Sequence, residues 1–271
     1  MAKDFFSLGS KGSVPEFETL DLGVSIICYN GNGGEVHIPA EINDEKVVSI
    51  GEDVFGENKS ITSVTIPGSV TKIGERAFKD CTQLTNLIIE DGLNEIGEQA
   101  FAGCKNLETV FLGAGIRKID SSAFGLCGHL ESLELPDGVI SIGTGAFRSC
   151  KNLENIAIPD SVMEISEEAF MSCKNLETVS LGSGITAIAA LTFSGCTNLE
   201  NIEIPDSVIE IGSEAFVNCK NLRKLTIPDS VVKLGTGAFD GCLSIEVKYK
   251  TETYSYEHLE ELYELLADED Y

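Results

Sequence analysis

Residues 196–218 read CTNLENIEIPDSVIEIGSEAFVN, and residues 219–241 read CKNLRKLTIPDSVVKLGTGAFDG. The two stretches share a cysteine, a leucine, an Ile-Pro pair and an Ala-Phe pair at equal spacing. The phenylalanine of this unit recurs every 23 residues through nine copies without an insertion. Its positions are Phe55, Phe78, Phe101, Phe124, Phe147, Phe170, Phe193, Phe216 and Phe239. So strict a period indicates a repeat protein in which each unit stacks on the next.

Other columns of residues keep the same period. An aliphatic residue stands five positions before each phenylalanine and is usually followed by glycine. Cysteine stands three positions after the phenylalanine in every copy but the first, where Asn58 takes its place. The cysteine column is Cys81, Cys104, Cys127, Cys150, Cys173, Cys196, Cys219 and Cys242. Because equivalent residues of stacked units point the same way, these columns predict continuous interior rows of side chains.

Each unit contains two extended runs. Aliphatic residues at spacings of three and then two, such as Leu199, Ile202 and Ile204, predict a short strand. Pro or Gly follows in most copies and predicts that the chain turns there. In the second run, Val208 and Ile211 are expected to point inward, and the Ser-Glu-Ala-Phe stretch after it is expected to form a helical or 3₁₀ turn. One such unit cannot close a core alone, so its strands must stack on those of its neighbours.

Residue for residue, the unit resembles the BspA-type leucine-rich repeat, in which the Cys, Leu, Ile-Pro, Ile-Gly and Ala-Phe elements recur together. The resemblance covers roughly residues 36–243. It implies a right-handed leucine-rich-repeat solenoid with a parallel β-sheet on one face and short helical or 3₁₀ turns and extended segments on the others. The resemblance also implies a family that is common among surface and secreted proteins of host-associated bacteria and some protozoan parasites. These proteins are linked to adhesion and protein binding. In such repeats, Asn or Cys at the cysteine position helps to satisfy the backbone.

The cysteines are interpreted as structural. A row of equivalent thiols points in one direction, whereas a disulfide needs two side chains that face each other. The sequence has no CxxC, and His37, His129 and His258 show no zinc-like spacing to the cysteines. We therefore expect the eight periodic thiols to be reduced and buried as small apolar groups. Cys28 stands outside the column and is a candidate for a reactive thiol.

Both ends of the chain depart from the repeat. Residues 1–19 are expected to be a flexible tail, and residues 20–50 to be an N-terminal hairpin with an enlarged capping coil. The hairpin is inferred from alternating apolar residues on both sides of an Asn-Gly-Asn-Gly-Gly stretch, whose Asn and Gly would supply positive φ. Residues 51–243 hold the repeats, and residues 244–271 a capping strand and a helix that begins after Ser255, a candidate N-cap. We favour a cover for the last coil over a docking element as the role of this helix.

Composition narrows the choice of partners. The formal net charge of −25 argues against nucleic acids and anionic membranes, and it favours a basic partner, cations or simple solubility. No apolar run is long enough to insert into a membrane. The N-terminus lacks the apolar segment of a secretory signal, so a cytoplasmic location stands as the alternative to the cell-surface or secreted location that the resemblance implies.

Enzyme chemistry finds no support in the sequence. It contains no GxGxxG, no phosphate-binding GxxxxGK[ST], no HExxH, no GxSxG and no acidic calcium loop. The many carboxylates recur with the repeat, whereas a catalytic acid and base need unlike environments. We therefore expect no catalytic residue, no metal and no cofactor.

The strand face is the candidate binding surface. In each strand the residue between the last two aliphatics points outward, because side chains alternate along a strand. This outward column comprises Thr65, Ile88, Phe111, Glu134, Ala157, Ser180, Glu203 and Thr226. The interior columns repeat and this one does not, which separates the scaffold from the surface that would meet a partner.

A column of glutamates runs beside the strands. It comprises Glu108, Glu131, Glu154, Glu177 and Glu200. Three positions before this column, lysine recurs as Lys105, Lys151, Lys174 and Lys220. Stacked like charges are unfavourable unless they are paired or screened. We favour a lattice of Lys and Glu side chains between coils over a cation site.

Two functions remain open. The first is a binding or adhesion module that engages a protein partner through its sheet face, either a basic or an extracellular host protein, with a glycan as the less favoured ligand. The second is an intracellular scaffold or assembly protein without a surface role. A native leader sequence would discriminate between them.

Overall fold

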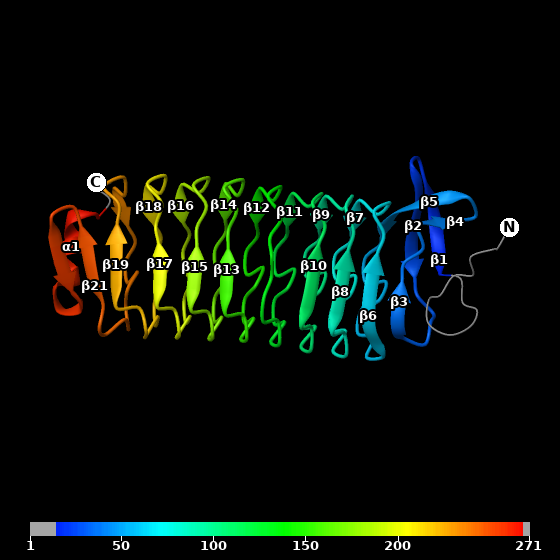
Figure 1. Ribbon diagram of the computed structural model, residues 1–271, viewed down its shortest axis with the longest axis horizontal. Coiled ribbons are helices and arrows are strands. Elements are labelled where there is room, and N and C mark those ends of the chain that lie inside the picture. The colour runs from blue at the N-terminus through cyan, green and yellow to red at the C-terminus, as the bar shows by residue number, and fades with distance from the viewer. Residues whose placement is uncertain (1–14, 268–271) are drawn as a thin grey trace.

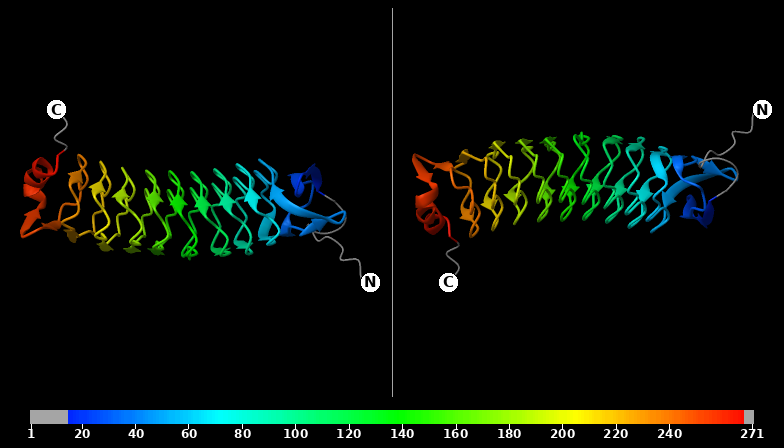
Figure 2. Two further views of the ribbon diagram at one scale, coloured as in Figure 1. Left: turned by 90° about the horizontal axis from the view of Figure 1, so that it is seen from above. Right: turned by 90° about the horizontal axis from the view of Figure 1, so that it is seen from below.

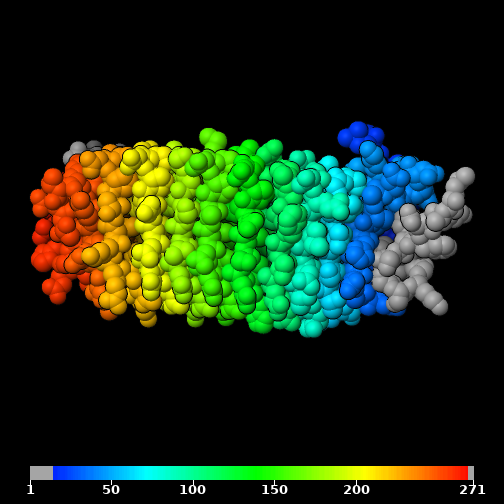
Figure 3. Space-filling view, viewed as in Figure 1, coloured from blue at the N-terminus to red at the C-terminus, as the bar shows by residue number. Residues whose placement is uncertain are grey.

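The computed structural model describes residues 15–267, which form one elongated β-solenoid (Figure 1). Successive coils lie one behind another along the long axis, and the first and last described residues lie at opposite ends (Figure 2). Side chains close the coils into a continuous body (Figure 3). The predicted repeat solenoid with parallel sheets is confirmed, and in the described chain helix is confined to a short segment near the C-terminal end.

The first extended run of each repeat forms the sheet that lines one face of the solenoid, the front sheet. Its repeat strands pair in parallel, so that Thr65, Ile88 and Phe111 lie side by side, whereas the last strand of the sheet pairs antiparallel. In chain order, the groups of paired strands are β3 (Gly34–His37), β6 (Ile61–Ile66), β8 (Asn86–Ile89) and β10 (Thr109–Leu112); β13 (Asn155–Ala157), β15 (Thr178–Ser180) and β17 (Asn201–Glu203); and β19 (Lys224–Ile227), β21 (Glu246–Tyr249) and β22 (Glu252–Ser255). The coil between the first two groups contributes one bridge, from Ser132 to Asn155.

The second extended run forms another sheet of short parallel strands, the second sheet. Ile50, Ile73 and Ile96 lie in register in it. Its repeat strands are β5 (Glu45–Ile50), β7 (Lys72–Ile73), β9 (Glu95–Ile96), β11 (Lys118–Ile119), β12 (Ser141–Ile142) and β14 (Glu164–Ile165), followed by β16 (Ala187–Ile188), β18 (Glu210–Ile211) and β20 (Lys233–Leu234). Val208 and Ile211 are fully buried, as predicted.

The third side of each coil consists of linked β-turns rather than the expected helical or 3₁₀ turn. The Ala102 N–H, for example, donates to the Gln99 carbonyl at 3.1 Å. Gln99 and Gly103 have φ values of +53° and +74°, which interrupt helical geometry. Other amides bond to the next coil instead, as where the Phe101 N–H donates to the Ala123 carbonyl at 2.8 Å. Hydrogen bonds between coils therefore run along this side as well.

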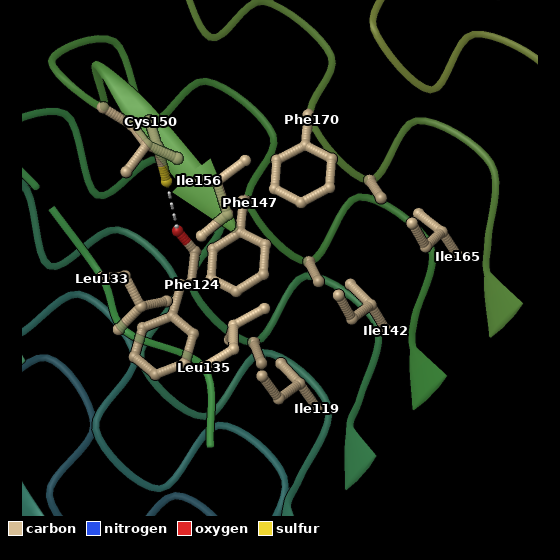
Figure 4. Close-up of a cluster of buried hydrophobic side chains, with 14 of the residues drawn as sticks. Ile119, Phe124, Leu133, Leu135, Ile142, Phe147, Cys150, Ile156, Ile165 and Phe170 are labelled. Carbon is tan, nitrogen blue, oxygen red and sulfur yellow. Dashed lines mark hydrogen bonds between the residues drawn. The ribbon is translucent and has the colours of Figure 1, made fainter. Parts of the chain in front are cut away.

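The periodic phenylalanines form one stack through the core. Rings of successive coils have centroids 4.6–5.8 Å apart and interplanar angles of 2–15°. Figure 4 shows the central rings of this stack, Phe124, Phe147 and Phe170. All nine rings are buried, and each contributes about 1.5–3 kcal/mol through removal from water. Because each ring touches the ring before and after it, an insertion in one coil would break the stack.

The cysteine row is buried and bonded to the backbone. Each thiol donates to the carbonyl of the phenylalanine in the preceding coil, as Cys104 Sγ does to Phe78 at 3.2 Å and Cys150 Sγ to Phe124 at 3.2 Å (Figure 4). This bond satisfies a buried carbonyl, which is the role that the family resemblance implies for the position. Burial raises the pKa of the thiols from Cys81 to Cys219, to about 12 at Cys81 and Cys173. At the C-terminal end of the row, the interaction with the Cys219 thiol lowers the pKa of Cys242.

The N-terminal hairpin differs from the prediction. β2 (Gly23–Cys28) pairs antiparallel with β1 (Glu16–Leu20), while β3 pairs in parallel with β6 in the front sheet. The chain crosses between the two sheets, and Gly33 and Gly34, not asparagines, hold positive φ there. The predicted hairpin is wrong because β2 and β3 each pair with the next coil rather than with each other. Residues 16–19, predicted to be tail, belong to the strand β1; residues 1–14 of that tail lie outside the described residues.

The enlarged first coil contains a second, short hairpin. β4 (Glu41–Ile42) pairs antiparallel with the start of β5, and the chain turns at Asn43 and Asp44, with φ of +52° and +65°. Two residues at positive φ are typical of a type I′ turn. The Tyr29 ring lies 4.7 Å from the Phe55 ring, between centroids, and so covers the first ring of the stack.

The C-terminal segment packs on the last coil. After β22 come a 3₁₀ turn, η1 (Tyr256–His258), and the helix α1 (Leu259–Leu265). Leu259, Leu262 and Leu266 are buried in the core cluster. The Tyr263 ring lies 6.4 Å from Phe239, and its hydroxyl accepts a hydrogen bond from the Phe239 N–H at 2.9 Å. We propose that this segment is the C-terminal cap.

The helix begins differently from the prediction. Ser255 belongs to β22 and makes no side-chain hydrogen bond to the helix backbone. Its Oγ lies 2.8 Å from Nδ1 of His258 instead. α1 then begins at Leu259 without a side-chain cap, so its stability comes from the apolar face that it buries.

The cysteine row predicts a loss of stability at alkaline pH. In the folded chain the pKa of the thiols from Cys81 to Cys219 is raised, to about 12 at Cys81 and Cys173, whereas an unfolded cysteine titrates near about 8.5. The unfolded chain therefore releases these protons first. The stabilisation is complete below about pH 8.5 and falls as the pH rises toward 12, by up to about 1.4 kcal/mol per pH unit for each thiol.

Urea unfolding between pH 7 and pH 10 measures this effect. The double variant Cys127→Ala, Cys150→Ala removes two titrating groups and is expected to show a shallower pH dependence, whatever its stability at pH 7. Equal slopes for the two proteins would mean that the thiols do not cause the loss.

The C-terminal packing predicts unequal effects of two substitutions on one helix. Leu262→Asp places a carboxylate where the side chain is fully buried and is expected to lower the free energy of unfolding by about 3 kcal/mol or more. Leu265→Asp, at a residue that is 59% exposed, is expected to change it by less than about 1 kcal/mol. Chemical denaturation measures both, and light scattering detects association of an uncovered last coil. A small effect of Leu262→Asp would remove the capping role.

Candidate partner-binding face

The residues predicted to bind a partner form one row on the outer side of the front sheet, called the outward row. Each lies between residues that point into the core, as Ile88 does between the buried Leu87 and Ile89. Thr65 is half-buried, and the other residues are exposed. The row comprises Thr65, Ile88, Phe111, Glu134, Ala157, Ser180, Glu203 and Thr226. The structure thus places them together on one surface; their role in binding stays a prediction.

Ile88 and Phe111 form an apolar pair within this row. They are register partners on β8 and β10, and they are 42% and 60% exposed. The interior sides of the same strands are filled by other side chains, such as Leu87 and Leu112. The pair therefore adds little to the core, and an exposed aromatic next to an exposed aliphatic is typical of an interface anchor.

A shallow groove of about 530 Å³ continues the outward row from the coil after Phe111. Ala157 and Ser180 present small side chains in its middle, and Glu134 and Glu203 stand at its two ends. Small residues leave the strand surface accessible between the two carboxylates. The groove therefore presents small side chains between two carboxylates.

A second row, parallel to the first and exposed except at the half-buried Ser63, supplies polar groups. It comprises Ser63, Asn86, Thr109, Ser132, Asn155, Thr178, Asn201 and Lys224. Asn155, Thr178 and Asn201 line the groove. The Thr178 hydroxyl donates to Oδ1 of Asn155, which leaves the amide nitrogen of Asn155 directed to other acceptors. The groove thus combines carboxylates at its ends with hydrogen-bonding groups along its side.

The predicted lattice of Lys and Glu side chains is wrong. Each member of the glutamate column is exposed, and so are the lysines assigned to it. None of the ion pairs found between described residues joins the two columns. The glutamates are aligned by their backbones instead, as where the Glu177 N–H donates to the Glu154 carbonyl at 2.8 Å. Their carboxylates face solvent, which makes this edge of the front sheet acidic.

The turn residue Asp160 has a structural role. Asp160 Oδ1 accepts hydrogen bonds from the N–H and the hydroxyl of Ser183 in the next coil, at 2.7 and 3.0 Å. These bonds lower the pKa of Asp160.

Within residues 15–267, no three His, Cys, Asp or Glu side chains are grouped so that they could hold a metal ion. The described chain also has no helix of sufficient length and apolarity to cross a membrane.

One surface feature was missed at the sequence level. Ile140, Met163, Ile209 and Val232 are exposed and occupy equivalent positions in four repeats. Each follows a valine that points into the core, so the alternation of side chains places it outside. The 23-residue spacing of these aliphatic residues is the signal that would have revealed the feature.

A parallel sheet built from 23-residue coils, with a phenylalanine stack and a row of thiols bonded to carbonyls, defines a leucine-rich-repeat β-solenoid. The chain belongs to the BspA-type leucine-rich-repeat family, since the family described as "BspA type Leucine rich repeat region (6 copies)" matches residues 35–136 and 117–246.

Several solved structures share this architecture. The leucine-rich-repeat protein TpLRR of T. pallidum is 30% identical over 76% of this chain and 87% of that chain, with a TM-score of 0.58. A leucine-rich-repeat protein of Bacteroides ovatus is 25% identical over 90% of this chain and 71% of that chain, with a TM-score of 0.61. A leucine rich cell surface protein of Faecalibacterium prausnitzii is 23% identical over 97% and 99%, with a TM-score of 0.50, and shows the fold alone. No curated protein matches the chain.

Thiol chemistry is predicted to be confined to one residue. Cys28 is half-buried, whereas the other eight cysteines are buried. A thiol reagent is therefore expected to modify Cys28 alone in the native protein and all nine cysteines after denaturation. Cys28→Ser is the control and should abolish the native reaction. Modification of several thiols in the native variant, or native disulfides, would refute the buried, reduced row.

Proposed function

We propose that this protein is a binding module of the adhesion type that engages a protein partner through the outer side of its front sheet. The observation that carries the proposal is the continuous outward row, in which the exposed Ile88–Phe111 pair precedes a groove ended by Glu134 and Glu203. An apolar anchor beside polar and charged groups is the usual composition of a protein-binding surface. The family consists typically of binding modules rather than enzymes.

The partner is proposed to be a protein with a basic surface, such as an extracellular host protein. The net charge of −25 and the acidic edge of the front sheet attract basic groups and repel phosphate backbones. A glycan is the less favoured ligand, because the most prominent element of the row is an apolar pair rather than a set of converging hydrogen-bonding groups. A location at the cell surface or outside the cell is part of the same proposal and follows the family resemblance.

The test starts with the folded protein as bait in extracellular fractions from the host and in lysate of the source cells. Partners identified by mass spectrometry are then purified and titrated directly. The double variant Ile88→Thr, Phe111→Ser is expected to weaken binding about tenfold or more, since both anchors are lost. Its free energy of unfolding should stay within about 0.5 kcal/mol of the wild-type value for each exposed site.

Leu126→Asn is the matched control. It removes an apolar side chain that is 55% exposed on the turn side, at φ +65°, a conformation that asparagine tolerates. Binding is expected to be unchanged in this variant. If the control and the double variant bind equally, the front sheet is not the site. Capture restricted to intracellular assembly proteins of the source cell would favour the scaffold function instead.

The groove adds a kinetic prediction. Glu134→Gln with Glu203→Gln removes two carboxylates from the ends of the groove and is expected to slow association at low salt several-fold, as steering by charge is lost. The difference should shrink as salt increases. Stopped-flow measurement of association rates at several salt concentrations tests it, and an association rate that is unchanged at low salt would remove these carboxylates from the site.

A further inference from the structure

A second apolar feature lies on another side of the solenoid. Ile140, Met163, Ile209 and Val232 are 46%, 68%, 53% and 68% exposed, and each directly precedes a strand of the second sheet. With the exposed Thr186 in the coil between Met163 and Ile209, they form a line over five successive coils, called the lateral stripe. It lies beside the strands of the second sheet, away from the strands that carry the outward row, and it is independent of the proposed function.

The residues of the lateral stripe are held side by side by the backbone. The Met163 N–H donates to the Ile140 carbonyl at 2.8 Å, and the Val232 N–H donates to the Ile209 carbonyl at 2.9 Å. The stripe is therefore a ledge with equivalent side chains in adjacent coils. Its exposed area is apolar in four of five coils.

Folding does not require these apolar residues. The equivalent positions of the preceding coils are Thr71, Asn94 and Arg117, all exposed and polar, on the same backbone. In every one of these coils the inward residue just before them, such as Val139 or Val162, is fully buried and supplies the core contact. Exposed aliphatic side chains at these outward positions therefore indicate a surface that is covered by a partner outside the solenoid.

Acidic residues flank the lateral stripe in the chain. Three positions before its aliphatic members stand Asp137, Asp160, Asp206 and Asp229, all exposed. Glu164 directly follows Met163, and Glu210 follows Ile209, where it pairs with Lys233 at 3.4 Å. Ser141 and Lys233 hold this position after Ile140 and Val232. An apolar line with an aspartate before each aliphatic residue and two glutamates after it is complementary to a partner element that has an apolar face and basic borders.

The spacing of the coils selects the shape of that element. In this half of the solenoid, equivalent ring centroids are 5.4–5.8 Å apart in successive coils, and paired strands lie about 4.8 Å apart. An α-helix advances about 5.4 Å per turn, so apolar residues three and four positions apart meet one coil after another. An extended strand presents a side chain on one face every ~6.6 Å, which exceeds these spacings by about 1–2 Å per coil, so it loses register over the length of the stripe.

We propose that the lateral stripe is a docking site for a basic amphipathic α-helix of a partner protein. A second copy of this chain does not supply the element, because the exposed residues of its own helix α1 include Glu260, Glu261 and Glu264. Apolar side chains at positions i, i+3 or i+4, and i+7 of the bound helix lie on the stripe, and its lysines or arginines reach the flanking carboxylates. This mode resembles helix-in-groove recognition, except that the helix packs on an exposed apolar line and not in an enclosed groove.

Synthetic peptides on the full-length protein test this proposal. The probe is a lysine-rich 18-residue peptide with leucines at helical spacing. The controls are a peptide of equal composition with leucines alternating as in a strand, and one with scrambled order. Fluorescence anisotropy is expected to show binding of the helical probe, and circular dichroism is expected to show that the probe gains helicity on binding. The affinity should fall with added salt.

The matched variants distinguish the surface. The fourfold variant replaces Ile140, Met163, Ile209 and Val232 by threonine. Its affinity for the helical probe is expected to be lower by about tenfold or more, while the protein stays folded. Ile88→Thr with Phe111→Ser on the front sheet is expected to leave that affinity unchanged, whether or not the front sheet binds another protein. Equal binding of the scrambled peptide, or equal affinity in the fourfold threonine variant, would mean charge attraction without a site and would overturn the proposal. Absence of binding by the helical probe would overturn it as well.

Discussion

The stacking of each coil on the next is the constraint on which the whole structure depends. A single coil has only a few apolar side chains and cannot enclose them, so every ring in the phenylalanine stack has its partners in other coils. The thiol-to-carbonyl bond adds a polar link of the same kind, from one coil to the previous one. Both contacts require residues 23 positions apart to superimpose, which is why the repeats carry no insertions.

The same constraint explains why the ends are built differently. A stacked ring at either end would have one face in water, and here a tyrosine covers it at each end. Tyr29 lies against Phe55, and Tyr263 lies against Phe239, where its hydroxyl also accepts the Phe239 N–H. Tyrosine suits this place because its ring continues the apolar stack while its hydroxyl meets a polar group. The end segments can therefore depart from the repeat without leaving the core open.

A rigid interior that is determined by stacking leaves the outward positions free to vary. Along one strand row the residue changes from Ile88 and Phe111 to Ala157 and then Glu203, while the interior side chains of the same strands stay aliphatic. The second sheet has its own variable position, polar at Arg117 and aliphatic at Met163. Two sides of one scaffold thus carry different chemistry at no expense to the core, which permits two partners to be bound independently.

The sequence by itself determined the coil, its interior rows and the outward strand positions, because these follow from a period and from the alternation of side chains. Only the tertiary structure decided which strands pair at the N-terminal end, where β2 and β3 enter different sheets, and that the glutamate column remains unpaired with lysine. The groove between Glu134 and Glu203 also emerged only in three dimensions. The physical reason is that periodic residues meet equivalent neighbours, whereas pairing at an end, ion pairs and surface relief depend on contacts between residues that no period relates.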